Sequence, residues 1–231
     1  HGWQGIIEIN PDKNADNSDH YQVLTEEIVN KAGRTGGTFL HTSRTRPSHV
    51  GKERVPNHLK DKYTGDVNDL TPDVLKNLDF LGVDYLIPIG GDDTLSFSAR
   101  LQKEGVPIVA IPKTMDNDVL GTDYCIGFST AITRGVNHIT YFRSSVGSHE
   151  RIGVVELFGR NSGETALITG YLAHVDRTII CEVPFDMDRL ISMLDQDKKT
   201  SPSHYALVVI SEGAMPIGGH VMQTGTPDAY G

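Results

Sequence analysis

The stretch "VDYLIPIGGDDT" (Val83–Thr94) shows a pattern that recurs from there toward the carboxyl end of the chain. Its first eight residues form a short, apolar and partly β-branched run bounded by Asp and Gly, which is typical of a buried β-strand. Two glycines and two aspartates follow directly at the end of that strand. A helix is expected next, over residues 94–105, because apolar residues recur there on one face.

The same alternation of apolar strands and helices continues toward the carboxyl end. Strands are expected at 106–112, 151–159, 177–184 and 205–213, and helices at 129–146, 163–174 and 186–199. Near-continuous apolar strands separated by helices favour a parallel sheet with helices on both faces. The first 60 residues are less regular, and a short helix within Tyr21–Gly33 is the one element expected there.

Composition excludes several classes of protein. The net charge of −9 over 231 residues argues against binding to nucleic acid or a membrane surface. Cys125 and Cys181 lie far apart without metal-ligand spacing, so both are expected to be reduced and buried in a cytoplasmic protein. No apolar stretch is long enough to span a membrane. A start at His1 and a glycine-rich end suggest a fragment of a longer chain.

Polar clusters recur directly after the predicted strands. They read GGDDT (90–94), KTMDND (113–118), GRNSGE (159–164) and SEG (211–213). In parallel α/β sheets, ligands bind beyond the carboxyl ends of the strands. The sequence therefore predicts an active site at this edge.

The carboxylates of these clusters suit a cation and a proton transfer. Asp116 and Asp118 are two residues apart, so in an extended loop their side chains would share a direction and repel each other. Mg²⁺ takes few carboxylates, together with water and substrate phosphates. Asp92 with Asp118 would suit Mg²⁺, leaving Asp116 to take a proton from a hydroxyl. Two plainer alternatives stay open: one aspartate of GGDDT caps the following helix, and DND is an Asx-rich turn.

Cationic and hydroxyl groups beside these carboxylates favour a phosphorylated ligand. Lys113 and Thr114 offer a charge and a hydroxyl to phosphate oxygens. Four arginines are candidate phosphate clamps: Arg44, Arg46, Arg151 and Arg160. Each arginine alone is more often a solvated surface residue. Glu212 would accept sugar hydroxyls or cap a loop.

Taken together, these stretches resemble the phosphofructokinase family. The resemblance is carried by GGTFLHTSR (36–44), GGDDT, PKTMDND (112–118), GTDYCIGFSTA (121–131), SSVGSHERIGVVELFGR (144–160) and SEG. It implies two similar Rossmann-like, three-layer α/β domains with parallel-rich sheets and an active site in the cleft between them. A donor- and Mg²⁺-binding domain is expected at 1–127 and a sugar-phosphate-binding domain at 128–231. Both are expected to be truncated relative to the family.

The resemblance also implies a role for each matching residue. Asp116 is similar to the base that activates the sugar 1-hydroxyl, and Asp92 and Asp118 to the Mg²⁺ ligands. Thr114 and Arg160 would contact the transferred phosphoryl group. The implied sugar-phosphate-binding residues are Phe158, Gly159, Glu212 and Arg151, and the implied donor-bridging residue is Arg44. Because Arg151 resembles an arginine that acts from a neighbouring subunit, a homo-oligomer, dimer or tetramer, with shared active sites is expected.

Asp93 and Lys113 indicate the phosphoryl donor. ATP-dependent members of the family typically carry glycine in place of Asp93, and often in place of Lys113, so this pair resembles the pyrophosphate-dependent branch. The Asp93 carboxylate would repel a nucleotide α-phosphate, and Lys113 would meet the charge of pyrophosphate. The implied activity is reversible phosphoryl transfer from pyrophosphate to fructose 6-phosphate, which gives fructose 1,6-bisphosphate and phosphate.

Three other functions remain as alternatives. An ATP-dependent 6-phosphofructokinase would follow if Asp93 and Lys113 are poor donor markers. A non-catalytic regulatory subunit is disfavoured because Asp92, Asp116, Asp118 and Arg160 are all intact. A lipid or dinucleotide kinase with a GGD motif is disfavoured because PKTMDND and residues 144–160 would then be unexplained.

Overall fold

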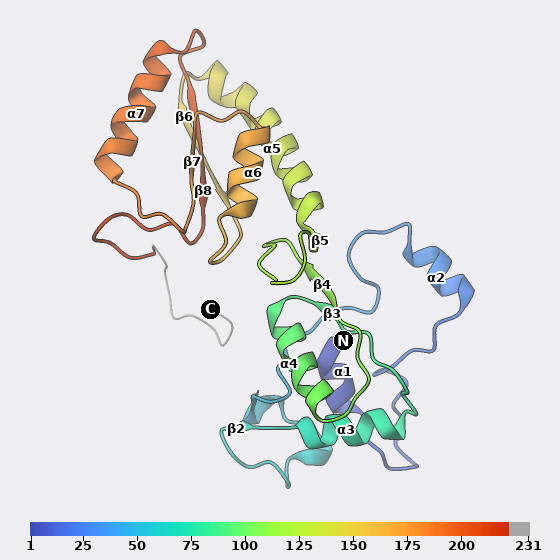
Figure 1. The fold of residues 1–231 in the computed structure, drawn as a ribbon. Helices are drawn as coiled ribbons and strands as arrows, with labels where there is room; N and C mark the ends of the chain where they lie inside the picture. The colour runs from blue at the N-terminus through green and yellow to red at the C-terminus, as the bar shows by residue number, and fades with distance from the viewer. Residues whose placement is uncertain (222–231) are drawn as a thin grey trace. The chain divides into compact units, whose positions relative to one another are not determined.

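The computed structural model describes residues 1–221, which form two compact units (Figure 1). Unit 1 comprises His1–Ile111, and unit 2 begins at Pro112. Each unit mixes helices with short or medium strands, and most of the strand pairings are parallel. The prediction of an α/β protein with parallel sheets is therefore confirmed. The two similar domains, their boundary at residue 127 and the cleft between them stay predictions, and residues 222–231 lie outside the described part.

Unit 1 is built from short elements around one apolar core. Its helices and strands are α1 (Gly2–Glu8), α2 (Glu26–Ala32), β1 (Val50–Gly51), η1 (Lys52–Arg54), η2 (Asn57–Leu59), β2 (Val67–Asn68), α3 (Thr71–Phe80), β3 (Ile89–Gly90) and α4 (Asp92–Lys103). In the core, the ring of Trp3 on α1 meets the ring of Phe97 on α4 edge-on at 4.9 Å. Leu70 and Val74 pack into the same cluster, fully buried, so α3 joins the two other helices.

The two strands expected at 83–90 and 106–112 lie side by side in parallel, but their regular parts are short. Leu86 bridges Ile108, and the Leu86 amide donates to the Pro107 carbonyl at 2.9 Å. The Ile111 amide donates to the Pro88 carbonyl, also at 2.9 Å. Prolines at 88 and 107 carry no N–H, so the ladder of hydrogen bonds cannot run without interruption.

Helices α1 and α3 are not predicted from the sequence. In the structure, the buried side-chain amide of Asn77 on α3 links the two helices by hydrogen bonds. Asn77 on α3 is 2% exposed, and its Nδ2 donates to the Ile6 carbonyl at 2.9 Å and the Ile9 carbonyl at 3.0 Å. The last carbonyls of a helix have no partner within it, so a side chain must satisfy them when they are buried. Asn77 does so for α1, across 68 to 71 residues of chain.

Unit 2 is a three-layer α/β arrangement. Its elements are β4 (Ile111–Thr114), which starts at the unit boundary, β5 (Ile126–Gly127), α5 (Phe128–Ser148), β6 (Ile152–Leu157), α6 (Glu164–Leu172), β7 (Arg177–Ile179), α7 (Met187–Thr200) and β8 (Ala206–Ser211). The strand order β6–β8–β7 makes a fully parallel sheet. Helices α5 and α6 cover one face, and α7 covers the other (Figure 1).

The central strand β8 shows why this unit needs both layers. Leu207 and Val209 point into the cluster with α5 and α6, while Ala206 and Val208 point into the cluster with α7. Successive side chains of a strand point to opposite faces, so an unbroken apolar run requires cover on both. The strands and helices predicted for 151–213 match these elements in order, although β7 is shorter than expected.

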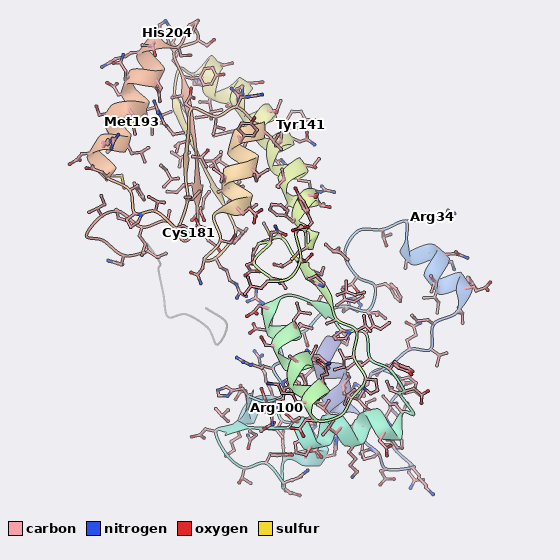
Figure 2. The ribbon with its side chains drawn as sticks, in the orientation of Figure 1. Arg34, Arg100, Tyr141, Cys181, Met193 and His204 are labelled. Carbon is pink, nitrogen blue, oxygen red and sulfur yellow. The ribbon has the colours of Figure 1, made fainter. Side chains whose placement is uncertain are left out.

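Both cysteines are free, as predicted, but one is more exposed than expected. Cys125 is buried, whereas Cys181 is half-buried. The residue follows β7, where the chain leaves the sheet, and Figure 2 labels it near that end of the strands. Its thiol donates to the Glu182 carboxylate at 3.3 Å. In the part of the chain that the structure describes, no helix is long and apolar enough to cross a bilayer.

Replacing Asn77 by Ala should destabilise unit 1, because two buried carbonyls lose their donor. Each unpaired buried carbonyl costs about 1–3 kcal/mol. At roughly 2–4 °C per kcal/mol for a chain of this size, the loss of both bonds should lower the thermal midpoint of the full-length protein by at least about 4 °C. Asn30→Ala, at an exposed position of α2, is the matched control and should stay near the wild-type midpoint. Equal midpoints for the two variants would show that Asn77 does not stabilise α1.

Candidate active site

The loop after β4 carries two of the predicted carboxylates. Strand β4 pairs in parallel with β5, with Lys113 opposite Ile126 and Thr114 opposite Gly127. The Thr114 hydroxyl then accepts a hydrogen bond from the Asp116 amide at 3.2 Å, which turns the chain immediately after the strand. Asp116 is half-buried, and Asp118 is exposed. The loop therefore presents one sheltered and one open carboxylate.

A second group of predicted residues meets at the carboxyl end of β6 and β8. Because Leu157 pairs with Ser211, the next residues of both strands leave the sheet at the same edge. The Glu212 carboxylate there accepts hydrogen bonds from the amides of Gly159, at 3.3 Å, and of Arg160. These contacts define a tight turn, which we call the Arg160 turn (residues 158–162).

The Arg160 turn has a strained backbone. Arg160 has φ +47°, in the left-handed region that side chains other than glycine rarely adopt. Such conformations cost of order 1–3 kcal/mol and cluster at functional sites. Gly213 makes the turn possible, since a Cβ at that position would lie 2.1 Å from the Arg160 carbonyl oxygen.

The loop after β4 and the Arg160 turn lie close enough for their charges to interact. Partial burial raises the pKa of Asp116 above its ordinary value, and the nearby negative charge of Asp118 adds to this effect. The Thr114 hydroxyl and the Arg160 guanidinium oppose the rise in that pKa, and the Glu212 carboxylate reinforces it. A carboxyl group with a raised pKa among specific charges is typical of a proton-transfer site.

The donor set of this site fits Mg²⁺. Asp118 is exposed, and its like charge beside Asp116 favours a cation. Residues 1–221 contain no cluster of three or more His, Cys, Asp or Glu able to hold a metal ion. Mg²⁺ usually keeps several waters and binds one or two carboxylates plus phosphate oxygens, so it needs no such cluster.

The other predicted Mg²⁺ ligand, Asp92, and the aspartate predicted to select the donor, Asp93, lie in unit 1. Asp92 and Asp93 occupy the first turn of α4, both exposed, and the N-cap is Gly91. The alternative in which one aspartate caps the helix is therefore wrong. Gly90 is needed for packing, since a Cβ there would lie 2.5 Å from the Thr94 hydroxyl oxygen.

Arg44 lines a polar cavity of unit 1. The cavity has a volume of about 510 Å³ and is also lined by Ser43, Thr45, Arg54 and Lys60, among others. An Arg54 Nη donates to the Arg44 carbonyl at 3.4 Å, which ties the two basic segments together. Arg44, Arg54 and Lys60 outnumber the two carboxylates that also line the cavity, Glu8 and Glu53. An excess of cations with nearby hydroxyls suits a phosphate-bearing ligand.

The remaining predicted residues occupy different places in unit 2. Lys113 is exposed on β4, and Phe158 is exposed directly after β6. Arg151 precedes β6, so the strand Ile152–Leu157 separates it from the Arg160 turn. Six residues of strand span roughly 20 Å. The structure thus brings together Thr114, Asp116, Asp118, Arg160 and Glu212, and it does not bring Arg151 of the same unit to them.

Comparison with known proteins identifies the family. The family model described as "Phosphofructokinase" matches residues 1–229. The chain belongs to the phosphofructokinase family. It is 34% identical to "ATP-dependent 6-phosphofructokinase 3" of Streptomyces coelicolor, over the whole chain and 60% of that protein. It is 36% identical to "Pyrophosphate--fructose 6-phosphate 1-phosphotransferase" of Thermoproteus tenax, over 95% of the chain and 57% of that protein. The chain thus spans about 60% of the length of these curated relatives.

A solved structure shares the fold. Phosphofructokinase from Pichia pastoris in the T-state superposes with a TM-score of 0.57 at 22% identity, over 64% of this chain and 18% of that one. The likeness supports the parallel α/β architecture of the phosphofructokinase family for the part covered. The prediction of family membership from the sequence motifs is confirmed.

Three residues that support the site are not predicted from the sequence. Asn117 lies between the two loop carboxylates, with φ +53°. Glu164 and Thr165 begin α6, and both reach the loop after β4 with their side chains. The DND and GRNSGE clusters mark the two segments, but no spacing rule shows that they touch.

Replacing Gly213 by Ala should distort the Arg160 turn, because the new Cβ would overlap the Arg160 carbonyl oxygen. We expect a destabilisation of roughly 1–3 kcal/mol, as for other overpacked positions. Thermal unfolding of the full-length protein would measure it. Gly33→Ala is the matched control, since a Cβ there meets no atom within 4 Å. An unchanged midpoint for Gly213→Ala would show that the turn is not tightly held.

Proposed function

We propose that the full-length protein is a pyrophosphate-dependent 6-phosphofructokinase of the cytoplasm. It would transfer a phosphoryl group reversibly from pyrophosphate to the 1-hydroxyl of fructose 6-phosphate. The observation that carries the proposal is the half-buried Asp116, whose pKa is raised by burial and by Asp118 while Arg160 opposes the rise. Such a carboxylate, near the positive charge of Arg160, suits deprotonation of a hydroxyl that attacks phosphorus.

The proposed reaction is a single in-line displacement. The sugar 1-oxygen forms a bond to the terminal phosphorus of pyrophosphate, and the bond from that phosphorus to the bridging oxygen breaks. Asp116 takes the proton of the hydroxyl, and inorganic phosphate leaves. Thr114 and Arg160 would contact the transferred group as its charge spreads over the equatorial oxygens. Positioning and electrostatics supply most of the acceleration in reactions of this kind.

The substrates would be held by the other predicted residues. Phe158, Gly159 and Glu212 would line the sugar-phosphate pocket at the edge of the unit 2 sheet. One Glu212 oxygen accepts two amides of the Arg160 turn, which leaves the other oxygen to accept a sugar hydroxyl. Arg44 would bridge the donor from its polar cavity. Asp92 and Asp118 would hold Mg²⁺, which when bound neutralises charge on the phosphate oxygens.

Asp93 and Lys113 support pyrophosphate as the donor. Both side chains are exposed, Asp93 in the first turn of α4 and Lys113 on β4, so each is free to meet a ligand. The Asp93 carboxylate would repel the additional phosphate of a nucleotide, while the Lys113 ammonium group would attract pyrophosphate. The relatives' names include both donors at similar identity, so the donor rests on these two residues.

Arg151 supports a homo-oligomer with shared active sites. It lies at the opposite end of β6 from the Arg160 turn. Arg151 would therefore bind the sugar phosphate in the active site of a neighbouring subunit, and not in that of its own. The predicted domains at 1–127 and 128–231, with the active site between them, remain part of this proposal. An ATP-dependent 6-phosphofructokinase is the first alternative. A regulatory, non-catalytic subunit is the second, and the intact charge arrangement at Asp116 disfavours it.

The choice of donor can be measured directly. The full-length protein with Mg²⁺ and fructose 6-phosphate should form fructose 1,6-bisphosphate with pyrophosphate and not with ATP. Asp93→Gly combined with Lys113→Gly should raise the ATP rate at least about tenfold, because a like-charge contact costs several kcal/mol. Asp84→Gly, an exposed aspartate of the preceding segment, is the control and should not change the donor preference.

Each outcome of the donor assay has a distinct meaning. Activity with ATP alone would keep the phosphofructokinase assignment and reject pyrophosphate as donor. No activity with either donor would reject the catalytic assignment and favour the regulatory subunit.

Replacing Asp116 by Ser should lower kcat by about 10²–10⁴-fold, because the hydroxyl cannot act as the base. The KM for fructose 6-phosphate should change little, since Asp116 acts on the proton rather than on binding. Steady-state kinetics of the full-length protein would separate the two constants. Asp188→Ser, at an exposed site on α7, is the matched control. Near-normal turnover of Asp116→Ser would remove Asp116 from the role of base.

A further inference from the structure

The loop after β4 is fastened to the start of α6 by side chains outside the predicted site. Asn117 makes three hydrogen bonds: its Oδ1 accepts from the Cys125 amide at 2.8 Å, and its Nδ2 donates to the Asp123 carbonyl and the Glu164 carboxylate, each at 3.1 Å. The first two bonds close the loop 117–125 on itself. The third bond reaches α6, 47 residues further along the chain.

A second fastening comes from the next residue of α6. The Thr165 hydroxyl donates to the Met115 carbonyl at 2.7 Å. Thr165 is 1% exposed, so its hydroxyl is shielded from water and depends on this bond for a partner. Asp116 is thereby held through both of its neighbours, Met115 and Asn117, while its own amide is bound to Thr114.

The start of α6 is itself tied to the Arg160 turn. Glu164 follows Arg160 by four residues, and its amide is bonded to the Ser162 hydroxyl at 3.4 Å. The Ser162 amide donates to the Gly159 carbonyl at 2.7 Å. A continuous set of short contacts therefore runs from the loop that carries Asp116 to the turn that carries Arg160.

We infer that Asn117, Glu164 and Thr165 are positioning residues that set the location of the Asp116 carboxylate relative to Arg160. We call these three residues the brace. The inference rests on the proposed function, because it assigns the brace a part in catalysis. A shift of about 1 Å at a reacting group can cost as much as 10²-fold in rate. A displaced loop would therefore slow turnover without removing any group that binds substrate.

Asn117 is well suited to this place for two reasons. Its amide offers a donor and an acceptor at once, which the three bonds require. Asparagine also tolerates the left-handed backbone seen here, φ +53°, better than most side chains. Glycine would adopt the same backbone conformation but could make none of the three side-chain bonds. Aspartate has the same shape as asparagine, but its carboxylate would be repelled by that of Glu164.

Two matched pairs of variants of the full-length protein test the brace. Thr165→Val removes the hydroxyl that binds Met115, whereas Thr169→Val, one turn later on α6, removes an equally buried hydroxyl that has no hydrogen-bond partner. Glu164→Ala removes the acceptor of the Asn117 bond, whereas Glu164→Gln keeps an oxygen in its place. Asn117→Gly removes all three bonds without backbone strain.

We expect kcat to fall roughly 10- to 100-fold in Asn117→Gly, and by less in Thr165→Val and Glu164→Ala. The KM for fructose 6-phosphate should stay close to that of the Thr169→Val control. The thermal midpoint should fall by a few degrees in Asn117→Gly and Thr165→Val, because polar groups lose their partners, so kcat is measured well below that midpoint. Glu164→Gln should restore most of the rate that Glu164→Ala loses. Unchanged kcat in Asn117→Gly and Glu164→Ala, or a loss that Thr169→Val shares, would overturn the inference.

Failure of the proposed function would be recognised separately. If the wild-type protein transfers no phosphoryl group, hydrogen exchange of the Cys125 amide still tests the brace. Asn117→Gly should expose that amide and speed its exchange, because its acceptor is lost. An unchanged exchange rate would show that Asn117 does not hold the loop, and the brace would be rejected on structural grounds alone.

Discussion

The parallel pairing of β6 with β8 is the constraint on which the site in unit 2 depends. The register from Ile152 opposite Ala206 to Leu157 opposite Ser211 ends both strands at one level. A shift of one residue would turn every side chain of a strand to the other face, so the buried Leu207 and Val209 fix this register through packing. Apolar burial inside the sheet thus sets where the Glu212 carboxylate meets the amides of the Arg160 turn.

Hydrogen bonds stabilise two residues of the site whose backbones adopt the left-handed conformation. Arg160 and Asn117 both have positive φ, and each costs free energy that the surrounding structure must offset. Glu212 offsets it at Arg160 with a carboxylate bonded to two amides, and Gly213 leaves room for the carbonyl. At Asn117 the side chain itself makes the compensating bonds. Charge and hydrogen bonding, rather than apolar packing, fix these two turns.

Sequence patterns predict the parts of the structure that depend on short-range periodicity. The helices and strands of residues 128–213 follow the predicted order because apolar runs and amphipathic helices carry their own signal. Helices α1 and α3 have weaker signals, and their pairing through Asn77 joins residues about 70 positions apart. The same limit explains why the sequence does not predict Thr165 beside Met115, since a single hydroxyl-to-carbonyl bond leaves no pattern in the chain. The grouping of Asp116, Asp118 and Arg160 is predictable because all three follow strand ends.

Donor choice and phosphoryl transfer place different demands on the residues. In the proposed reaction, a base, an arginine and a hydroxyl would act on the sugar oxygen and the transferred phosphorus, which are the same atoms for pyrophosphate and ATP. A nucleotide differs only in what lies beyond those atoms, so a few side chains there are enough to admit or repel it. Relatives named for different donors can therefore match this chain almost equally, at 34% and 36% identity. Overall sequence identity therefore reflects the shared chemistry of the family. The charges of Asp93 and Lys113 are the features that would bind the two donors differently.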